Sequence, residues 1–451
     1  MRAPPNSAPL ASAAVPREPD EAERLSPAPP VGERGARRVL RLATIDLRPL
    51  QRHRDYRLLF FGQATTFFGS MITYVAIPFQ AYELTGSSLV VGLLGAAELV
   101  PLLVTAFLGG ALADALDRRR LVLLTELSLM ATCAALLVNS LAGDPKLWVL
   151  FVVAAVMAGL DGLQRPSLTA LTPRLVERHE LPAAAALDSL RGTFAMVAGP
   201  AAGGVLIAAL GLPWTFGLDL ATFGVSLLCL AAMQAVPPPP DAERPSLRGI
   251  AEGVRFALDR QVLVGTYSVD TAAMFFGMPL ALFPALADDL GGPGVLGLLY
   301  AAPSAGAALA TLTSGWTARV HRHGLAVLLA AAGWGLGIVV CGLAGSVVLA
   351  CIGLVFAGFA DMLSGLFRST IWNQTVPDRL RGRLAGIEQI SYSAGPLLGN
   401  VEAGIVASLT TVRTSIVSGG ILCIVAVPIV ALLLPGFRRY DARAGDAAVR
   451  S

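Results

Sequence analysis

Two acidic residues stand inside long apolar segments of this 451-residue chain. Glu98 lies about ten residues into the apolar run 88–109, and Asp270 lies about eight residues into the run 263–286. An ionisable side chain at such depth is costly in hydrocarbon and is a functional hypothesis by default. Burial favours the neutral form of a carboxyl group, so both residues can alternate between protonated and ionised forms. We predict that Asp270 and Glu98 are proton-binding residues.

The sequence around Asp270 strengthens this prediction, because no basic residue lies between Arg260 and Arg319. We therefore expect the Asp270 carboxyl to have no basic partner. In the alternative interpretation, each acid is paired with a neighbour such as a hydroxyl group or Arg191, and its role is only structural.

A second set of charged residues lies toward the ends of apolar segments. Asp161 and Arg165 are spaced i,i+4 and can pair on one helix face, while Asp361 and Arg368 share a face two turns apart. The other members of this set, called the gate group below, are Asp114, Arg118, Arg119 and Glu126. One exposed pair contributes at most about 1 kcal/mol, but a network can set the balance between two conformations. We predict that the gate group closes the intracellular side of the molecule.

These residues are positioned by apolar helices. Hydrophobic residues make up 55% of the chain and charged residues only 14%, whereas soluble domains carry about 25% charged residues. About 20 apolar residues cross ~30 Å of hydrocarbon, so the sequence predicts an all-α integral membrane protein with twelve transmembrane helices. Their expected ranges are 58–82, 88–109, 121–142, 147–165, 184–211, 213–236, 263–286, 295–317, 324–345, 347–368, 384–409 and 412–435.

Arginine placement predicts the topology. Nearly all arginines lie in the N-terminal tail, in the C-terminal tail or in the loops after even-numbered segments, so the positive-inside rule places both termini in the cytoplasm. We expect a disordered cytoplasmic tail over 1–56, a six-helix bundle over 57–236 and a central loop with an amphipathic surface helix over 237–262. A second bundle over 263–436 and a cytoplasmic tail over 437–451 complete the expected organisation.

Catalytic, metal-binding and nucleotide-binding patterns are not found in the sequence. The five cysteines all lie inside apolar segments, where they are expected to pack. Neither a Cys/His metal spacing nor a phosphate-binding G-x-x-x-x-G-K-S/T loop occurs. We therefore expect no enzyme activity, no cofactor, no metal and no nucleic-acid partner.

The two halves of the sequence repeat. Gly110–Asp114 recurs as Gly315–Arg319, Asp161 recurs as Asp361, and Gly199-Pro200 recurs as Gly395-Pro396, at offsets of 205, 200 and 196 residues. Near-constant offsets indicate a duplicated six-helix unit. Parallel repeats of this kind occur in the two halves of major facilitator transporters.

Several motifs resemble those of the major facilitator superfamily. The run Gly109–Arg120 is similar to its G-x-L-A-D-x-x-G-R-R/K loop, with Asp117 in place of the usual glycine. In the fifth segment, the G-P-x-x-G-G motif of the superfamily's exporters is matched by Gly199, Pro200, Gly203 and Gly204. Over about 55–440 the chain resembles the bacterial enterobactin-exporter group, including Asp270–Ala285, Ala360–Met362 and Pro377–Arg383.

The resemblance implies two pseudo-symmetric six-helix bundles in a bacterial cytoplasmic membrane, functional as a monomer. It also implies alternating access, with proton antiport driving export of a siderophore, antibiotic or other drug-like compound. Candidate residues for contact with this substrate are Phe67, Met71, Tyr74, Arg191, Met274 and Phe275.

Two alternatives remain open at this point. The polar side chains of the first segment keep a proton-coupled nutrient importer possible: Gln63, Thr65, Thr66, Ser70 and Thr73. A transporter-like receptor or scaffold, with a partner bound to the N-terminal tail, is the second alternative.

Overall fold

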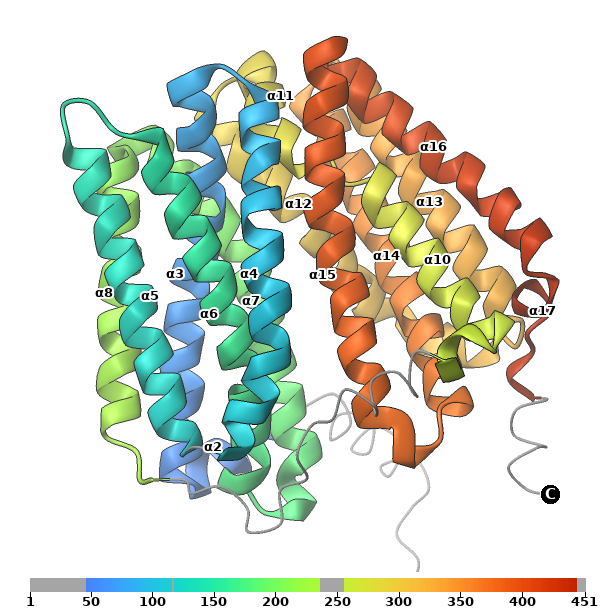
Figure 1. The fold of residues 1–451 in the computed structure, drawn as a ribbon, viewed down its shortest axis with the longest axis horizontal. Helices are drawn as coiled ribbons and strands as arrows, with labels where there is room; N and C mark the ends of the chain where they lie inside the picture. Colours follow the sequence, from blue (N-terminus) through green and yellow to red (C-terminus); the bar gives the residue numbers. More distant parts are fainter. Residues whose placement is uncertain (1–45, 116, 236–254, 444–451) are drawn as a thin grey trace, which may run out of the picture. The chain divides into compact units, whose positions relative to one another are not determined.

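The structure is a computed structural model that describes residues 46–115, 117–235 and 255–443 (Figure 1). Within these ranges the side chains of 107–115 and of most positions between 378 and 391 are left out. The described residues form helices and connections, with no strand among them. The predicted tails and most of the predicted amphipathic helix lie outside the described ranges, although residues 255–258 are helical.

The first half of the chain forms one set of helices, called the N-terminal bundle below. Its elements are α2 (Arg48–Arg52), α3 (Arg54–Thr85), α4 (Ser88–Ala115), α5 (Arg118–Leu141), α6 (Leu147–Leu175), η2 (Arg178–Glu180), α7 (Leu181–Leu210) and α8 (Leu212–Ala231). Within it α3 packs against α7 and α8, α4 against α6, and α5 against α6 and α8.

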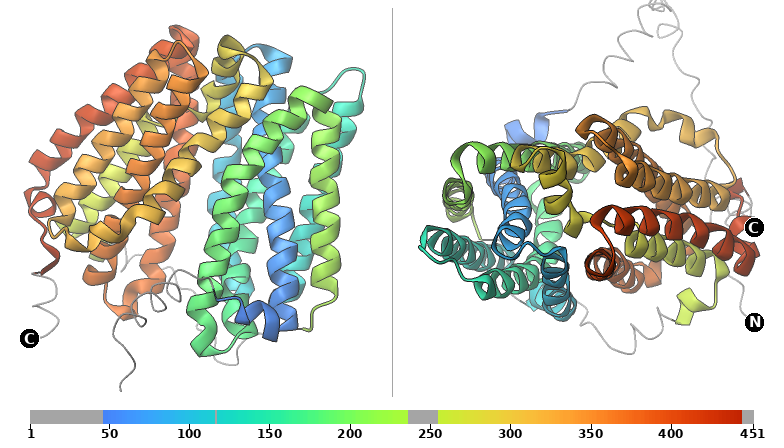
Figure 2. Two further views of the ribbon diagram at one scale, coloured as in Figure 1. Left: turned by 180° about the vertical axis from the view of Figure 1, so that it is seen from behind. Right: turned by 90° about the horizontal axis from the view of Figure 1, so that it is seen from above.

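The second half forms the C-terminal bundle. Its elements are α10 (Gln261–Phe276), η3 (Leu280–Leu282), α11 (Phe283–Leu290), α12 (Pro293–Thr313), η4 (Ser314–Arg319), α13 (His323–Leu343), α14 (Val347–Thr375), α15 (Asp378–Leu409), α16 (Val412–Leu433) and α17 (Pro435–Arg438). Here α14 packs against α12 and α13, α13 against α16, and α10 against α15 (Figure 2).

Eleven of the helical segments are long and apolar enough to cross a membrane. Together with α15, which is 32 residues long but more polar, they cover all twelve segments expected from the sequence. Helices α6 and α14 continue to Leu175 and Thr375, well past the predicted ends at 165 and 368. The prediction followed the apolar residues alone, whereas the helical backbone continues into the more polar residues after them.

The seventh segment, expected to be one helix over 263–286, is not continuous. Helix α10 ends at Phe276, and the chain continues through Pro279 into η3 and α11. Backbone groups freed by such a break must find partners in an apolar environment. The Asn400 side chain accepts from the Ala281 amide at 3.1 Å, and the Trp334 indole donates to the Gly277 carbonyl at 3.0 Å.

The two bundles touch through α4 with α15 and through α7 with α12. Glycines permit this approach: a Cβ added to Gly95 would lie 2.6 Å from the Leu397 carbonyl oxygen, and one added to Gly204 would lie 2.7 Å from Gly297 Cα. One buried apolar cluster joins both bundles, with members that include Val75, Leu94, Leu299 and Ala403. All these residues lie toward the end of the helices where α3 connects to α4.

Away from that end, the smaller apolar clusters belong to one bundle each. Leu59, Val122 and Leu230 lie together in the N-terminal bundle, and Val327, Phe367 and Phe437 in the C-terminal bundle. Apolar packing therefore joins the bundles at the end opposite α2 and α17 (Figure 1).

Candidate functional site

The centre of the C-terminal bundle holds a buried ion pair between Asp270 of α10 and Arg368 of α14. The two side chains are only 4% and 8% exposed. The expectation that Asp270 has no basic partner is therefore wrong. The prediction considered only residues close to Asp270 along the chain, where no basic residue lies between Arg260 and Arg319, whereas the partner Arg368 comes from another helix.

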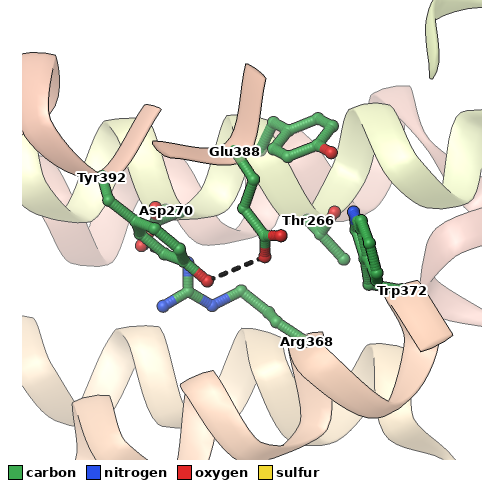
Figure 3. Close-up of a pocket in the computed structure, with 7 residues that line it drawn as sticks. Thr266, Asp270, Arg368, Trp372, Glu388 and Tyr392 are labelled. Carbon is green, nitrogen blue, oxygen red and sulfur yellow. Dashed lines mark hydrogen bonds and ion pairs between the residues drawn. The ribbon is translucent and has the colours of Figure 1, made fainter. Parts of the chain in front are cut away.

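Further polar side chains surround this ion pair in a small cavity (Figure 3). We call it the Arg368 site, and its lining residues are Thr266, Tyr267, Asp270, Arg368, Trp372, Glu388 and Tyr392. The Tyr392 hydroxyl donates to the Glu388 carboxylate at 2.9 Å, and the Arg368 guanidinium carbon lies 5.4 Å from the centre of the Tyr392 ring. The cavity measures about 10 Å³, which is room for a single water molecule.

Arg368 also lies 3.8 Å from Asp361, which is on α14 like Arg368, whereas Asp270 is on α10. One guanidinium thus neighbours the carboxyl groups of Asp270 and Asp361 and acts electrostatically on Glu388. The Arg368 Nε, the Tyr267 hydroxyl and the Trp372 indole N–H are buried and have no hydrogen-bond partner among the described residues. Three acids sharing one cation, beside free donors, can release or accept a proton when a ligand or a helix moves.

Glu98 lies on α4 in the N-terminal bundle and is half-buried. It acts electrostatically on the hydroxyl groups of Tyr74 on α3 and Tyr300 on α12, whose rings meet edge to face at 5.6 Å. In the part of the chain that the structure describes, Glu98 forms neither an ion pair nor a hydrogen bond. Because Tyr74 belongs to the N-terminal bundle and Tyr300 to the C-terminal bundle, Glu98 lies where the two bundles touch.

The gate group does not assemble as one network among the described residues. The Asp114 side chain lies outside them. Arg118 donates to the Ala170 carbonyl at 3.2 Å, and Arg119 donates to the Leu230 and Ala231 carbonyls at 2.7 Å. These bonds tie the start of α5 to α6 and α8 within one bundle.

The remaining pairs of the gate group also lie within single bundles. Asp161 and Arg165 form an exposed ion pair at 2.8 Å on α6, and Asp361 pairs with Arg368 in the C-terminal bundle. None of the ion pairs found between described residues joins the two bundles.

Glu126 is the clearest departure from the expected gate. Its side chain is 1% exposed and accepts from Gln63 Nε2 at 2.6 Å and from the Thr66 hydroxyl at 3.4 Å. The placement of Glu126 in the gate group is wrong, because this face of α5 is turned toward α3 inside the N-terminal bundle.

None of the residues expected to contact substrate lines the Arg368 site. Met71 of α3 packs against Gly199 of α7, and Tyr74 meets Tyr300. Met274 and the backbone of Phe275 pack against α15 at Gly395 and Gly399. Phe67 is half-buried, while Arg191 lies 3.8 Å from Asp188 and its Nε has no hydrogen-bond partner in the part of the chain that the structure describes.

The G-P-x-x-G-G motif of α7 forms helix contacts on both of its sides. A Cβ on Gly199 would lie 3.1 Å from the Phe68 carbonyl oxygen and one on Gly203 would lie 3.2 Å from the Ile72 carbonyl oxygen, both on α3. On the other side Gly204 meets Gly297 of α12. The motif therefore packs α7 between its own bundle and the opposite one.

Sequence reasoning missed Asp219 of α8, which is fully buried. Its carboxylate accepts from the Thr73 hydroxyl at 2.5 Å and from the Thr222 hydroxyl at 3.1 Å. The depth criterion that selected Glu98 and Asp270 also applies to this residue, seven positions into the segment 212–231. Glu388 lies only four residues into the expected segment 384–409, so the same criterion would not have selected it.

Comparison with known proteins decides the family. Residues 44–448 match the family described as transmembrane secretion effector. The chain belongs to this family of the major facilitator superfamily. It is 31% identical over 402 residues to the enterobactin exporter EntS of Shigella boydii serotype 4, covering 88% of this chain and 95% of the relative. EntS of Citrobacter koseri and of Escherichia coli O81 match to the same extent.

Solved structures confirm the major facilitator fold. A POT family transporter in complex with 5-aminolevulinic acid superposes with a TM-score of 0.68 at 12% identity, covering 85% of this chain and 97% of that one. A bacterial homologue of the human lysosomal transporter Spinster, inward-facing and unoccupied, gives 0.68 at 15% identity, covering 86% and 98%. This secretion effector is thus a multi-span membrane protein of a transporter family.

Proposed function

We propose that this protein is a secondary active exporter of small organic molecules such as siderophores, antibiotics or other drug-like compounds. The observation that carries the proposal is the 31% identity to enterobactin exporters along 95% of their length. Proton influx drives the export, and the monomer works by alternating access in a bacterial cytoplasmic membrane.

The proposed topology places both termini in the cytoplasm. It is supported by the arginines near the α2 and α17 ends of the bundles, such as Arg52, Arg119, Arg178 and Arg438. The bundles pack together at the opposite end, through Gly95 and Gly204. With this topology the described conformation faces inward.

Glu98 is the first candidate for the coupling proton. It has no charged partner among the described residues, it lies where the bundles touch, and two tyrosine hydroxyls are close to it. In the outward-facing conformation the α7–α12 and α4–α15 contacts must open, which exposes this carboxyl to the outside. A proton then loads at Glu98 and leaves toward the cytoplasm.

Asp270 takes a different role in this mechanism. Protonation of Asp270 removes the charge that holds Arg368, so the ion pair opens and α10 is free to move relative to α14. The gate group without Glu126, including Asp114 and the Asp161–Arg165 pair, closes the cytoplasmic side in the outward-facing conformation.

The importer alternative loses most of its support in the sequence. Three of the five polar residues of α3 that suggested it point into the N-terminal bundle: Gln63 and Thr66 donate to Glu126, and Thr73 donates to Asp219. Thr65 donates to the Phe61 carbonyl of its own helix, which leaves Ser70, a half-buried residue, as the remaining support.

Transport assays in inside-out vesicles test the proposal. With an acidic lumen we expect accumulation of labelled enterobactin or of another compound from a panel of siderophores and antibiotics. Accumulation that needs the opposite gradient identifies an importer. A panel that is bound but never moved identifies a receptor.

A further inference from the structure

Two layers of buried polar side chains lie inside the N-terminal bundle, away from the contact between the bundles. Each layer takes one residue from α3, one from α5 and one from α8. The first layer contains Thr66, Glu126 and Ser226, and the second contains Thr73, Cys133 and Asp219. The members on each helix are seven residues apart, so the layers are stacked about 10 Å apart along the helices.

The hydrogen bonds of the second layer are complete. The Asp219 carboxylate accepts from the Thr73 hydroxyl at 2.5 Å, the Thr222 hydroxyl at 3.1 Å and the Cys133 thiol at 3.6 Å. Three donors satisfy the Asp219 carboxylate, so we do not expect its hydrogen bonds to rearrange.

The first layer is incomplete in a way that points to a ligand. Glu126 accepts from Gln63 Nε2 at 2.6 Å and from Thr66 at 3.4 Å. The Ser226 side chain is fully buried and that of Gln164 is 7% exposed, and both lie next to the same carboxyl group. Both groups act on this carboxyl as hydrogen-bond donors, but among the described residues neither Ser226 Oγ nor Gln164 Nε2 reaches a partner with the distance and angle of a full hydrogen bond. Two buried donors therefore face the carboxyl without a fully formed hydrogen bond to it.

No charged side chain compensates Glu126 in the described structure. The groups that face it are Gln63 and Thr66 from α3, Gln164 from α6 and Ser226 from α8. Of the three arginines that begin α5, Arg118 and Arg119 bond to backbone carbonyls about two turns away, and Arg120 is exposed. Asp219 lies in the other layer.

Neutral hydroxyl and amide groups can serve both forms of a carboxyl group. Serine, threonine and glutamine side chains donate to a carboxylate, and their oxygens accept from a protonated acid. The charged form is then stabilised by four donors, and the neutral form by the acceptors of the same groups. Rotation of Ser226 and Gln164 is enough to change from one arrangement to the other.

We propose that Glu126 is a proton-binding site inside the N-terminal bundle, with Gln63, Thr66, Gln164 and Ser226 as its switching hydrogen-bond shell. Its ligand is a single proton that moves between a carboxyl oxygen and bulk water. On release, Ser226 and Gln164 turn to donate to the carboxylate. The site is separate from Glu98 and from the Arg368 site. Its use in transport rests on the proposed proton antiport, whereas proton binding itself does not.

Infrared difference spectroscopy of the purified full-length protein tests the site directly. Acidification should produce the carbonyl stretching band of a protonated carboxylic acid, and Glu126→Gln should remove a component of it. Asp219→Asn, the matched change in the other layer, should leave that component in place. Both replacements are nearly isosteric, and thermal melting checks that each variant is folded. Identical wild-type and Glu126→Gln spectra overturn the proposal.

A second variant tests the hydrogen-bond shell. Ser226→Ala removes a donor to the carboxylate, so the band should appear at higher pH than in the wild type. An unchanged midpoint for Ser226→Ala overturns the switching shell.

The oxygens around Glu126 also suit a sodium ion, and the same spectra decide between the two ligands. If sodium at fixed pH suppresses the band while choline does not, the site binds a metal cation and the proposal is wrong. An infrared titration without gradient-driven transport removes the proposed antiport but leaves the proton site. Gradient-driven transport in a protein whose spectra show no Glu126 band supports the proposed antiport but overturns the proton site at Glu126.

Discussion

Arg368 of α14 forms a buried ion pair with Asp270 of α10, two helices that are separated in the chain by the whole of α11, α12 and α13. The guanidinium also lies 3.8 Å from Asp361 on its own helix. Both charges are more than nine-tenths buried, so each depends on the other for compensation. The pair therefore joins two helices that alternating access must allow to move.

Asp270→Asn should destabilise the protein, because it leaves the Arg368 charge buried with only the more distant Asp361. Loss of one partner of a buried pair costs about 3–5 kcal/mol. We expect a clear decrease in melting temperature in detergent, and partial recovery in the double variant Asp270→Asn/Arg368→Gln. The exposed Asp161–Arg165 pair gives the control, since Asp161→Asn should change the melting temperature little. A wild-type melting temperature for Asp270→Asn would show that the pair contributes nothing.

The sequence predicted the helices well because each must bury about 20 apolar residues, which is a local property of the chain. The repeated motifs predicted the two bundles because a duplicated six-helix unit leaves matching motifs at near-constant offsets in the sequence. The Asp270–Arg368 pair could not be predicted in this way, since it depends on the rotation of α10 and α14 about their axes. Glu126 shows the same limit: its depth was visible, but the face of α5 that carries it was not.

Glu98→Gln should separate exchange from accumulation. The amide imitates a permanently protonated carboxyl, so exchange of labelled for unlabelled substrate should continue in proteoliposomes while a proton gradient no longer drives accumulation. Glu83→Gln, an exposed change near the end of α3, is the matched control and should behave as wild type. If Glu98→Gln still concentrates substrate, coupling is to be sought at Asp270 and then at Asp361.

Gly204→Val should separate the bundles where α7 meets α12, because a Cβ at Gly204 would lie 2.7 Å from Gly297 Cα. Spin labels at Ser87 and Ser408 in a cysteine-free background report the opening near the same end of α4 and α15. We expect a larger fraction of long distances and at least a several-fold loss of efflux. Gly217→Val is the control, since a Cβ at this position meets no atom within 4 Å. Unchanged distances in Gly204→Val would show that the helices shift without opening.

Asp114→Asn should reduce efflux severely while membrane insertion and folding stay intact. The prediction rests on the superfamily loop motif, in which this acid is proposed to close the cytoplasmic side. Asp117 is the matched control, because it caps α5 by accepting from the Arg120 amide at 3.0 Å, and asparagine is an equally good cap. Asp117→Asn should therefore keep both stability and transport. Efflux assays at equal expression of the two variants decide the matter: normal efflux by Asp114→Asn would reduce the motif to a turn between α4 and α5.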